Sequence, residues 1–271
     1  MENNNIINGN CWLACFDILG FTNEVKFAET KDKNNFILGM CEYLYDEIEL
    51  IKQFEEIEQG LVNIVWFSDT FIFYSPNDSK ECLKAIESVV RGFFRTAFTA
   101  NWHSQYKPTS GCIPIPLRGC LNYGHFYADS RKNIYWGSAF NEAYKLAENQ
   151  DWIGYALSEK AKSQIDKYHL NYWKTIEPYY KEYNVQMKDI ESKKLCAYYA
   201  GEHKVSDLDI LRERAGSDLA DGLFRMWINI KDFDKLCDEQ KQKIIKKYEN
   251  TKKFLSEVYP SIQSLLENIG K

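Results

Sequence analysis

The sequence predicts an α+β fold in which a mainly antiparallel sheet carries helices on one face. Short β-prone runs recur between residues 11 and 199, and stretches with apolar residues at helical spacing lie between them. Their order is strand, helices, hairpin, helix, strands, helix and strand, which is typical of α+β domains. A composition of 45% hydrophobic and 27% charged residues indicates a folded globular chain.

The first predicted element is a buried strand over residues 11–19. Its run "CWLACF" is almost wholly apolar and β-prone, and Gly20 ends it. The next stretch repeats apolar residues at the spacing of one helical face, which predicts a helix that packs one side inward. These residues are Ile37, Met40, Cys41, Leu44, Ile48 and Ile51.

A hairpin and a long helix follow. Two β-rich runs, 61–67 and 70–75, are separated by Ser68 and Asp69, which predicts a tight turn. Asp78 and Glu81 are spaced as a capping box, which predicts the start of a helix. The inner face of that helix carries Leu83, Ile86, Val90, Phe93, Phe94 and Ala97.

The remaining elements complete the sheet. Prolines and a glycine mark a loop over 108–116, and strands are predicted at 116–128 and 134–137. A helix over 138–149, a strand near 153–157, a helix opened by Ser158 and a strand pair near 183–187 and 194–199 follow. After Gly201 the chain becomes helical and charged. We expect one domain over 1–201 and a helical extension over 202–271, which serves as a cap on the sheet, an oligomerisation arm or a regulatory piece.

Charge and cysteine content narrow the class of protein. The net charge is -5, without a block of five like charges, which argues against partners such as nucleic acid or an anionic membrane. The N-terminal sequence has no secretory signal and no run is long enough to span a membrane. The 8 cysteines include no CxxC pair and read as buried reduced thiols. We therefore expect a soluble cytoplasmic protein.

Two aspartates at strand ends carry the chemistry. A buried carboxylate needs a cationic partner. Taken singly, Asp17 fits an N-cap for a helix near Thr22 or the partner of a buried arginine, and Asp69 fits an ordinary turn. Together, at the ends of adjacent buried strands, they suit a hard cation such as Mg²⁺ or Mn²⁺. The amides of "ILGFT" suit phosphate oxygens.

Four motifs in order resemble those of the class III nucleotide cyclases. "FDILGFT" resembles their first metal motif, and "SDT" resembles their second, with Ser68 in place of a glycine. "LRGCLNYG" is similar to their Arg-x-Gly-Ile strand. "WGSAFNEAYKLAE" matches Gly-x-x-x-Asn-x-x-x-Arg, with Gly137 and Asn141 in place. The resemblance spans roughly residues 11–200 and implies a ferredoxin-like cyclase catalytic domain over 1–201, with the helical extension packed on the domain or on the dimer.

The resemblance assigns roles to particular residues. It implies two divalent ions, Mn²⁺ or Mg²⁺, held by Asp17, Asp69 and the backbone carbonyl of Ile18. It implies that Asn141 orients the ribose and that Lys145 stabilises the transition-state phosphate, although a lysine lacks the bidentate fork of the family's arginine. The other implied substrate-binding residues are Gly20, Phe21 and Thr22 for the phosphates, and Lys188 for the terminal phosphates.

The chain departs from the family pattern at the positions that recognise the base of the nucleotide. The two positions that read a purine in the family are Val65 and Ile134 here, and both are apolar. A site without hydrogen-bonding specifiers cannot select that base strongly. The metal residues and Asn141 are nevertheless present. This combination resembles the pyrimidine cyclases of bacterial antiphage defence, the Pycsar systems. Four aromatic residues are candidates for narrowing the pocket to fit a single-ring base, although plain core packing also explains each of them. They are Tyr43, Tyr45, Trp66 and Phe67.

The resemblance implies a homodimeric cyclase with composite active sites that converts UTP to 3′,5′-cyclic UMP and pyrophosphate. A separate downstream effector would respond to the cyclic nucleotide. Alternatives are synthesis of cyclic CMP, relaxed use of ATP or GTP, and a catalytically silent nucleotide-binding or dimerisation module. A palm-type polymerase also uses two aspartates, but the negative charge and the lack of a basic channel argue against it.

Overall fold

The computed structural model describes residues 6–22, 25, 26, 29, 41, 42, 44–46, 48, 49, 51–53, 55–99, 114–199, 208–230, 236–267 and 269. They contain one sheet in the order β2-β3-β1-β4-β6-β8-β7, with β5 paired to β4 outside this path. The strands are β1 Ile6–Ile18, β2 Asn63–Phe67, β3 Thr70–Tyr74, β4 Leu117–Asp129, β5 Ile134–Trp136, β6 Gly154–Leu157, β7 Tyr180–Gln186 and β8 Ser192–Tyr198. In the described part of the chain β4 and β6 run parallel and the other pairs are antiparallel, which confirms the predicted fold class.

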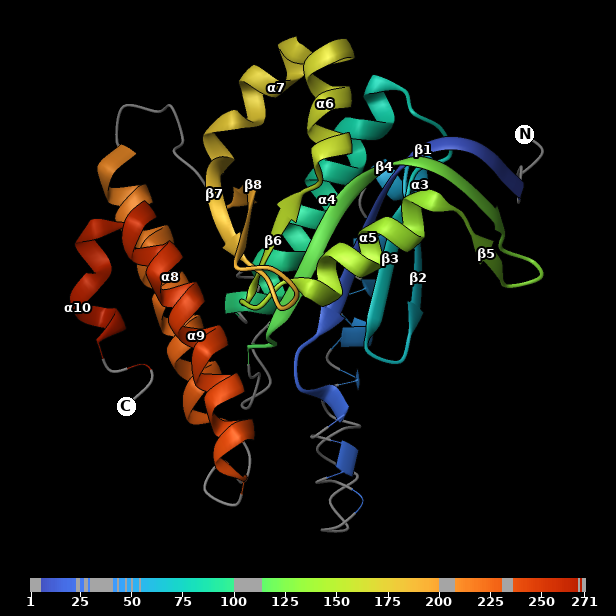
Figure 1. The fold of residues 1–271 in the computed structure, drawn as a ribbon. Helices are drawn as coiled ribbons and strands as arrows, with labels where there is room; N and C mark the ends of the chain where they lie inside the picture. Colours follow the sequence, from blue (N-terminus) through green and yellow to red (C-terminus); the bar gives the residue numbers. More distant parts are fainter. Residues whose placement is uncertain are drawn as a thin grey trace.

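Helices cover both faces of this sheet (Figure 1). They are α3 Glu55–Glu58, α4 Lys80–Thr99, α5 Ser138–Asn149, α6 Glu159–Tyr168, α7 Leu170–Ile176, η1 Glu177–Tyr179, α8 Leu208–Ile228, α9 Asp238–Val258, η3 Pro260–Ile262 and α10 Gln263–Leu266. None of those described is long and apolar enough to cross a bilayer. Trp12, Ala14 and Phe16 of β1 pack with α4 and α6, while Cys11, Leu13 and Cys15 pack with α5. The expectation of helices on one face is wrong, because the continuous apolar run of β1 is buried on both sides.

Most predicted elements lie within a few residues of their expected places, but one cap differs. The prediction that Asp78 and Glu81 form a capping box is wrong. The N-cap of α4 is Ser79, whose Oγ accepts from the amide of Cys82 at 3.2 Å, and Asp78 instead accepts from the hydroxyl of Tyr123 at 2.9 Å. Helix α7 was not predicted. In the helical stretch near residue 45, Leu44, Ile48 and Ile51 are buried as expected, while Ile37 and Met40 lie outside the described residues.

The C-terminal helices pack against the edge of the domain that carries β7 (Figure 1). Helix α8 lies so close to α4 that a Cβ on Gly222 would be 2.4 Å from the carbonyl oxygen of Phe98, so this crossing requires a glycine. Arg225 of α8 donates a hydrogen bond to the carbonyl of Thr99. The expected boundary at 201/202 lies outside the described residues.

The described cysteines are all free thiols. Cys11, Cys15, Cys82, Cys120 and Cys196 are buried, Cys41 is half-buried and Cys237 is exposed. Burial raises the pKa of Cys11 to about 12, so this thiol stays protonated. The reading of buried reduced thiols is confirmed for these five; Cys112 lies outside the described residues.

A carboxylate is buried between α4 and the far end of the sheet. Glu87 accepts hydrogen bonds from the hydroxyls of Tyr172 at 3.0 Å and Tyr180 at 3.1 Å, and its Oε1 lies 3.3 Å from Nε of Arg91. Burial raises the pKa of Glu87, and Arg91 and the two tyrosines offset this only in part. The ionised form is therefore costly in this position.

We expect Glu87 to make the protein less stable as the pH rises. A folded-state pKa above the unfolded value of 4.5 means that the contribution of Glu87 to the free energy of unfolding is complete below that value. It is lost as the pH rises through the folded pKa. Glu87→Gln cannot titrate, so the stability gap between wild type and variant should narrow in urea unfolding as the pH rises above about 4.5. A gap that widens would show that Arg91 outweighs burial.

Candidate functional site

The partner of Asp17 is a buried arginine on the neighbouring strand. In the sheet register, Asp17 of β1 lies directly opposite Thr70 of β3 on one side and Arg118 of β4 on the other. Oδ2 of Asp17 accepts from Nε of Arg118 at 2.8 Å and lies 2.6 Å from its Nη2. The two side chains are 13% and 10% exposed. Of the two roles that fit Asp17 alone, the buried arginine pair is the one formed.

Arg118 is itself fixed by the chain that follows α5. Its Nη1 donates to the carbonyl of Glu148 at 2.6 Å and, less closely, to that of Gln150 at 3.4 Å. The side chain of Gln150 in turn donates to the carbonyl of Gly119 at 2.9 Å. The motif around Arg118 was recognised in the sequence, but no role was assigned to this residue. The available signal was a charged side chain inside an otherwise apolar strand.

Asp69 is brought beside Asp17 by the hairpin turn. Ser68 and Asp69 form the two-residue turn between β2 and β3, with Ser68 at φ 57°. The amide of Ile18 donates to the carbonyl of Asp69 at 3.0 Å, which fastens this turn to the end of β1. Burial raises the pKa of Asp17, and the negative charge of Asp69 adds to the increase, while Arg118 opposes it. The two carboxylates are therefore electrostatic neighbours, as the sequence predicts.

The turn after β1 has the shape expected of a strand-to-helix connection. Gly20 has φ +84°, a conformation that favours glycine, and helical backbone begins at Phe21. The amide of Leu19 donates to the carbonyl of Pro116 at 2.8 Å, so the turn is held against the start of β4. Phe21 is half-buried and Thr22 is exposed. The predicted phosphate-binding turn thus lies next to Asp17 in the chain and in space.

Asn141 and Lys145 lie on the outer face of α5. Ala139, Ala143 and Ala147 turn toward the sheet, and the helical spacing places Asn141 and Lys145 on the opposite side, where both are exposed. Within the described residues no hydrogen bond or ion pair joins either side chain to Asp17. A single chain therefore assembles the aspartate pair without the asparagine and the lysine.

Tyr144 of the same helix does face the aspartates, which the sequence gave no reason to expect. Burial raises the pKa of its hydroxyl, and the charges of Glu148, Asp17 and Asp69 raise it further. Its ring lies 6.0 Å from that of Phe140, and the residue is 37% exposed. The hydroxyl therefore lies within the field of both carboxylates, on the side of α5 that borders the site.

The two base-reading positions lie in different surroundings. Val65 of β2 packs on the apolar cluster that includes Cys15 and Ile72, and so does Tyr135, the neighbour of Ile134 in β5. Side chains alternate along a strand, so Ile134 points to the other face of β5. The rings of Tyr74 and Tyr135 are 6.1 Å apart. Ile134 itself is 43% exposed. Neither position offers a hydrogen-bonding side chain.

The four aromatic candidates for the base pocket lie in different surroundings. Trp66 stacks on Phe71 at 5.4 Å in the core, so plain packing explains it. Phe67 is 78% exposed and lies opposite Thr70, in the same register row as Asp17 and Arg118. Tyr45 is exposed, and Tyr43 lies outside the described residues.

Lys188 lies in the β7–β8 connection, at the edge of the site. Its amide donates to the carbonyl of Asn149 at 2.8 Å, and its side chain is exposed. Burial lowers the pKa of the ammonium and the charge of Arg118 lowers it further, whereas Asp17 opposes this. Lys188 is thus an electrostatic neighbour of both members of the buried pair.

The donor atoms fit a hard divalent cation. Two carboxylates and the carbonyl of Ile18 are oxygen ligands of the kind that Mg²⁺ and Mn²⁺ take, with water and phosphate in the other positions. Arg118 occupies Oδ2 of Asp17, and Oδ1 accepts no hydrogen bond from the described residues. No cluster of three or more His, Cys, Asp or Glu side chains suited to a metal occurs in that part of the chain. A cation held here would therefore depend on substrate oxygens.

No family model matches the chain, and no curated protein matches it. Several solved structures do. The adenylyl cyclase CyaB from P. aeruginosa is 15% identical over 75% of this chain and 98% of its own, with a TM-score of 0.47. The catalytic core of a rhodopsin-guanylyl cyclase with converted specificity, in complex with ATPαS, is 14% identical over 72% and 97%, with a TM-score of 0.48. The monomeric guanylyl cyclase domain of the RhoGC fusion protein from the aquatic fungus Blastocladiella emersonii is 16% identical over 59% and 86%, with a TM-score of 0.44.

These three solved structures are adenylyl and guanylyl cyclases. Their identity to the chain is low and leaves the substrate open.

Proposed function

We propose that the chain is a nucleotide cyclase that converts UTP to 3′,5′-cyclic UMP and pyrophosphate. The observation that supports this most is the pairing of Asp17 and Asp69 at adjacent strand ends beside Arg118 and Lys188. Acidic oxygens for a divalent cation thereby adjoin positive charges for phosphates. In the reaction the ribose 3′-oxygen bonds to the α-phosphorus, the bond from that phosphorus to the bridging oxygen breaks, and pyrophosphate leaves with the electron pair.

Each residue has one task in this reaction. Two divalent cations, Mn²⁺ or Mg²⁺, on Asp17, Asp69 and the carbonyl of Ile18 would lower the pKa of the 3′-hydroxyl and neutralise the phosphates. Asn141 holds the ribose so that the attack is in line. Lys145 meets the charge that develops on the α-phosphoryl oxygens. The phosphate tail is bound by Lys188 and by the backbone turn at Gly20, Phe21 and Thr22.

We place Asn141 and Lys145 in the active site of a second copy. Both are exposed on the outer face of α5, and neither forms a hydrogen bond or ion pair with Asp17 among the residues the structure describes. Near the site, Phe67 of the hairpin and Tyr144 of α5 are exposed large apolar side chains, which mark interaction surfaces when they gather. A two-fold dimer would bring the aspartates of each copy to the asparagine and lysine of the other.

The pyrimidine substrate is inferred from the base-reading positions. Val65 packs into an apolar cluster and Ile134 has no polar atom in its side chain, so the purine edge would find no partner there. The motif pattern resembles the pyrimidine cyclases of Pycsar systems. We accordingly place the cyclic nucleotide in antiphage defence in the cytoplasm, upstream of a separate effector. Cyclic CMP is the alternative product.

A catalytically silent nucleotide-binding module is the second candidate. It is favoured by the ion pair between Arg118 and Asp17, which already neutralises one metal ligand. A decayed site would keep this pair as a structural bridge.

The test is incubation of the protein with Mn²⁺ and each of the four ribonucleoside triphosphates, with products identified by mass. Cyclic UMP as the main product supports the proposal. Cyclic CMP as the main product selects the alternative substrate, and cyclic AMP or GMP overturns the argument from Val65 and Ile134. The absence of any cyclic product, while triphosphate still binds, would favour the silent module.

A further inference from the structure

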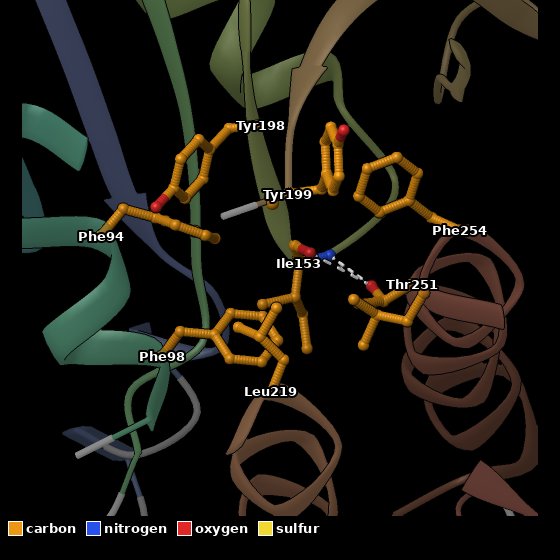
Figure 2. A pocket seen from close by; sticks show the side chains of 10 residues that line it. Phe94, Phe98, Ile153, Tyr198, Tyr199, Leu219, Thr251 and Phe254 are labelled. Atoms are coloured by element: carbon orange, nitrogen blue, oxygen red, sulfur yellow. Dashed lines mark hydrogen bonds between the residues drawn. The ribbon is translucent and has the colours of Figure 1, made fainter. Parts of the chain in front are cut away.

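Helix α9 is bonded directly to the segment that follows α5. The amide of Ile153 donates to Oγ1 of Thr251 at 2.8 Å, a contact drawn in Figure 2. One residue earlier in α9, Nδ2 of Asn250 donates to the carbonyl of Asp151 at 2.6 Å. One turn earlier again, Nζ of Lys246 lies 2.8 Å from Oδ2 of Asp151. Toward its N-terminus, α9 therefore follows the segment backward, from 153 to 151.

The same segment supports the candidate site. Nη1 of Arg118 binds the carbonyls of Glu148 and Gln150, and the amide of Lys188 binds the carbonyl of Asn149. Residues 148–153 thus hold Arg118 and Lys188 on one side and α9 on the other. A side chain of α9 one turn before Thr251 therefore lies at the border of the site.

The junction farther along α9 is a packed interface with no room for a ligand. Its cavity has a volume of about 10 Å³, the size of about one water molecule, and lies among apolar side chains from α4, α8 and α9 (Figure 2). Phe254 packs edge-on against Trp152 with ring centroids 4.9 Å apart. This packing fixes the position of α9, so the site is extended only by the turn that precedes it.

Lys247 lies on that turn, four residues before Thr251 and on the same face of α9. It is half-buried, and it makes no ion pair or side-chain hydrogen bond with the described residues. Burial lowers the pKa of its ammonium and Arg118 lowers it further, while Asp151 opposes this. The Asp151 carboxylate is already paired with Lys246.

Three cations are therefore electrostatic neighbours at this end of the site. Lys247 and Arg118 both lower the pKa of the Lys188 ammonium, so each is its electrostatic neighbour. Asp17 is paired with Arg118, and neither lysine has a carboxylate of its own in the described structure. Glu148, the remaining acidic neighbour of Lys188, forms no ion pair with it. Neighbouring positive charges that are partly removed from water repel one another and attract an anion.

We propose that Lys247 binds the terminal phosphates of the substrate together with Lys188 and Arg118, so that the C-terminal helix α9 completes the anion-binding part of the active site. This rests on the proposed function, since the anion is taken to be the tail of a nucleoside triphosphate. A lysine suits this task as a point charge that binds phosphate oxygens without a fixed geometry. The extension is then part of the site rather than an appended cap.

The experiment compares Lys247→Gln with Lys243→Gln in the full-length protein. Lys243 lies one turn earlier on α9, is exposed and pairs with Glu239 at 2.5 Å, so it is a matched control. Binding of inorganic tripolyphosphate is measured by calorimetry in saturating Mn²⁺, which requires no turnover. We expect the dissociation constant of Lys247→Gln to rise about tenfold or more and that of Lys243→Gln to stay within about twofold. Without ligand, Lys247→Gln should unfold at or above the wild-type temperature, because it removes like-charge repulsion.

The outcomes separate this inference from the function on which it rests. Unchanged tripolyphosphate binding in Lys247→Gln, an equal loss in Lys243→Gln, or no binding by wild type would each overturn the inference. If wild type makes cyclic nucleotide while Lys247→Gln keeps the wild-type KM, the cyclase activity is supported and the role of Lys247 is refuted. If no triphosphate is cyclised but Lys247→Gln still binds tripolyphosphate more weakly than wild type, the anion site is supported and the cyclase activity is refuted.

Discussion

Asp69→Asn is expected to lower the rate of cyclic nucleotide formation by about 1,000-fold or more. The carboxylate is half-buried in the hairpin turn, forms no ion pair with the described residues and faces Asp17, so its loss removes a metal ligand without breaking a structural bond. A divalent cation contributes several kcal/mol to a phosphoryl-transfer transition state, and each 1.36 kcal/mol is about tenfold in rate. The measurement is single-turnover formation of cyclic product in Mn²⁺.

The control for this variant is Asp166→Asn, on the exposed surface of α6. Among the residues that the structure describes, Asp166 forms an ion pair with Lys162 alone, one turn away on the same helix. Its replacement should leave the rate unchanged, and both variants should unfold within a few degrees of wild type. Asp69→Asn that keeps more than about a tenth of the wild-type rate would remove this aspartate from the metal site.

Mixing two inactive variants tests the composite site. Asp69→Asn and Asn141→Ala should each be inactive alone. In a two-fold dimer with sites shared between copies, an equal mixture should regain about one quarter of wild-type activity, because about half of the dimers are mixed and each mixed dimer has one intact site. No recovery after exchange of subunits would place both residues in one chain's site.

Much of the fold follows from local pattern. The apolar run of β1, the Ser68–Asp69 turn and the amphipathic helices α4 and α5 were all predicted from spacing within one stretch of sequence. The aspartate pair was also predicted, because a hairpin beside a buried strand brings their ends together and a carboxylate at each end is unusual. These features depend on contacts near in sequence or on one known strand pairing.

The parts of the fold and of the site that local pattern does not predict depend on strand register and on contacts between residues distant in the sequence. Arg118 meets Asp17 across a pairing of β1 with β4 whose register no local pattern fixes. The place of α5 on the second face required knowledge that β1 is buried on both sides. The position of Lys247 depends on the contacts by which Asn250 and Thr251 dock α9 on residues 151–153, and such polar contacts leave no periodic signal in the sequence.

Arg118→Met is expected to lower the free energy of unfolding by about 3–5 kcal/mol. The arginine is 10% exposed in its side chain and Asp17 is 13% exposed, so the variant leaves a buried carboxylate without its partner. It also frees the carbonyl of Glu148 from its donor at 2.6 Å. Urea unfolding measures the loss, with Lys160→Met as the control. Lys160 makes a similarly short ion pair with Glu142, at 2.6 Å, but 59% and 42% of the two side chains are exposed, so its loss should cost less than about 1 kcal/mol.

The double variant Asp17→Asn/Arg118→Met decides whether the loss comes from the stranded charge. Asp17→Asn alone leaves Arg118 buried without a carboxylate, so each single variant should be strongly destabilised. Removing both charges ends the penalty on the remaining partner, and the double variant should be more stable than the Arg118→Met single variant by about 1 kcal/mol or more. Additive losses would instead mean that Arg118 acts through its backbone bonds to Glu148 and Gln150. The ion pair would then be incidental to the stability of the fold.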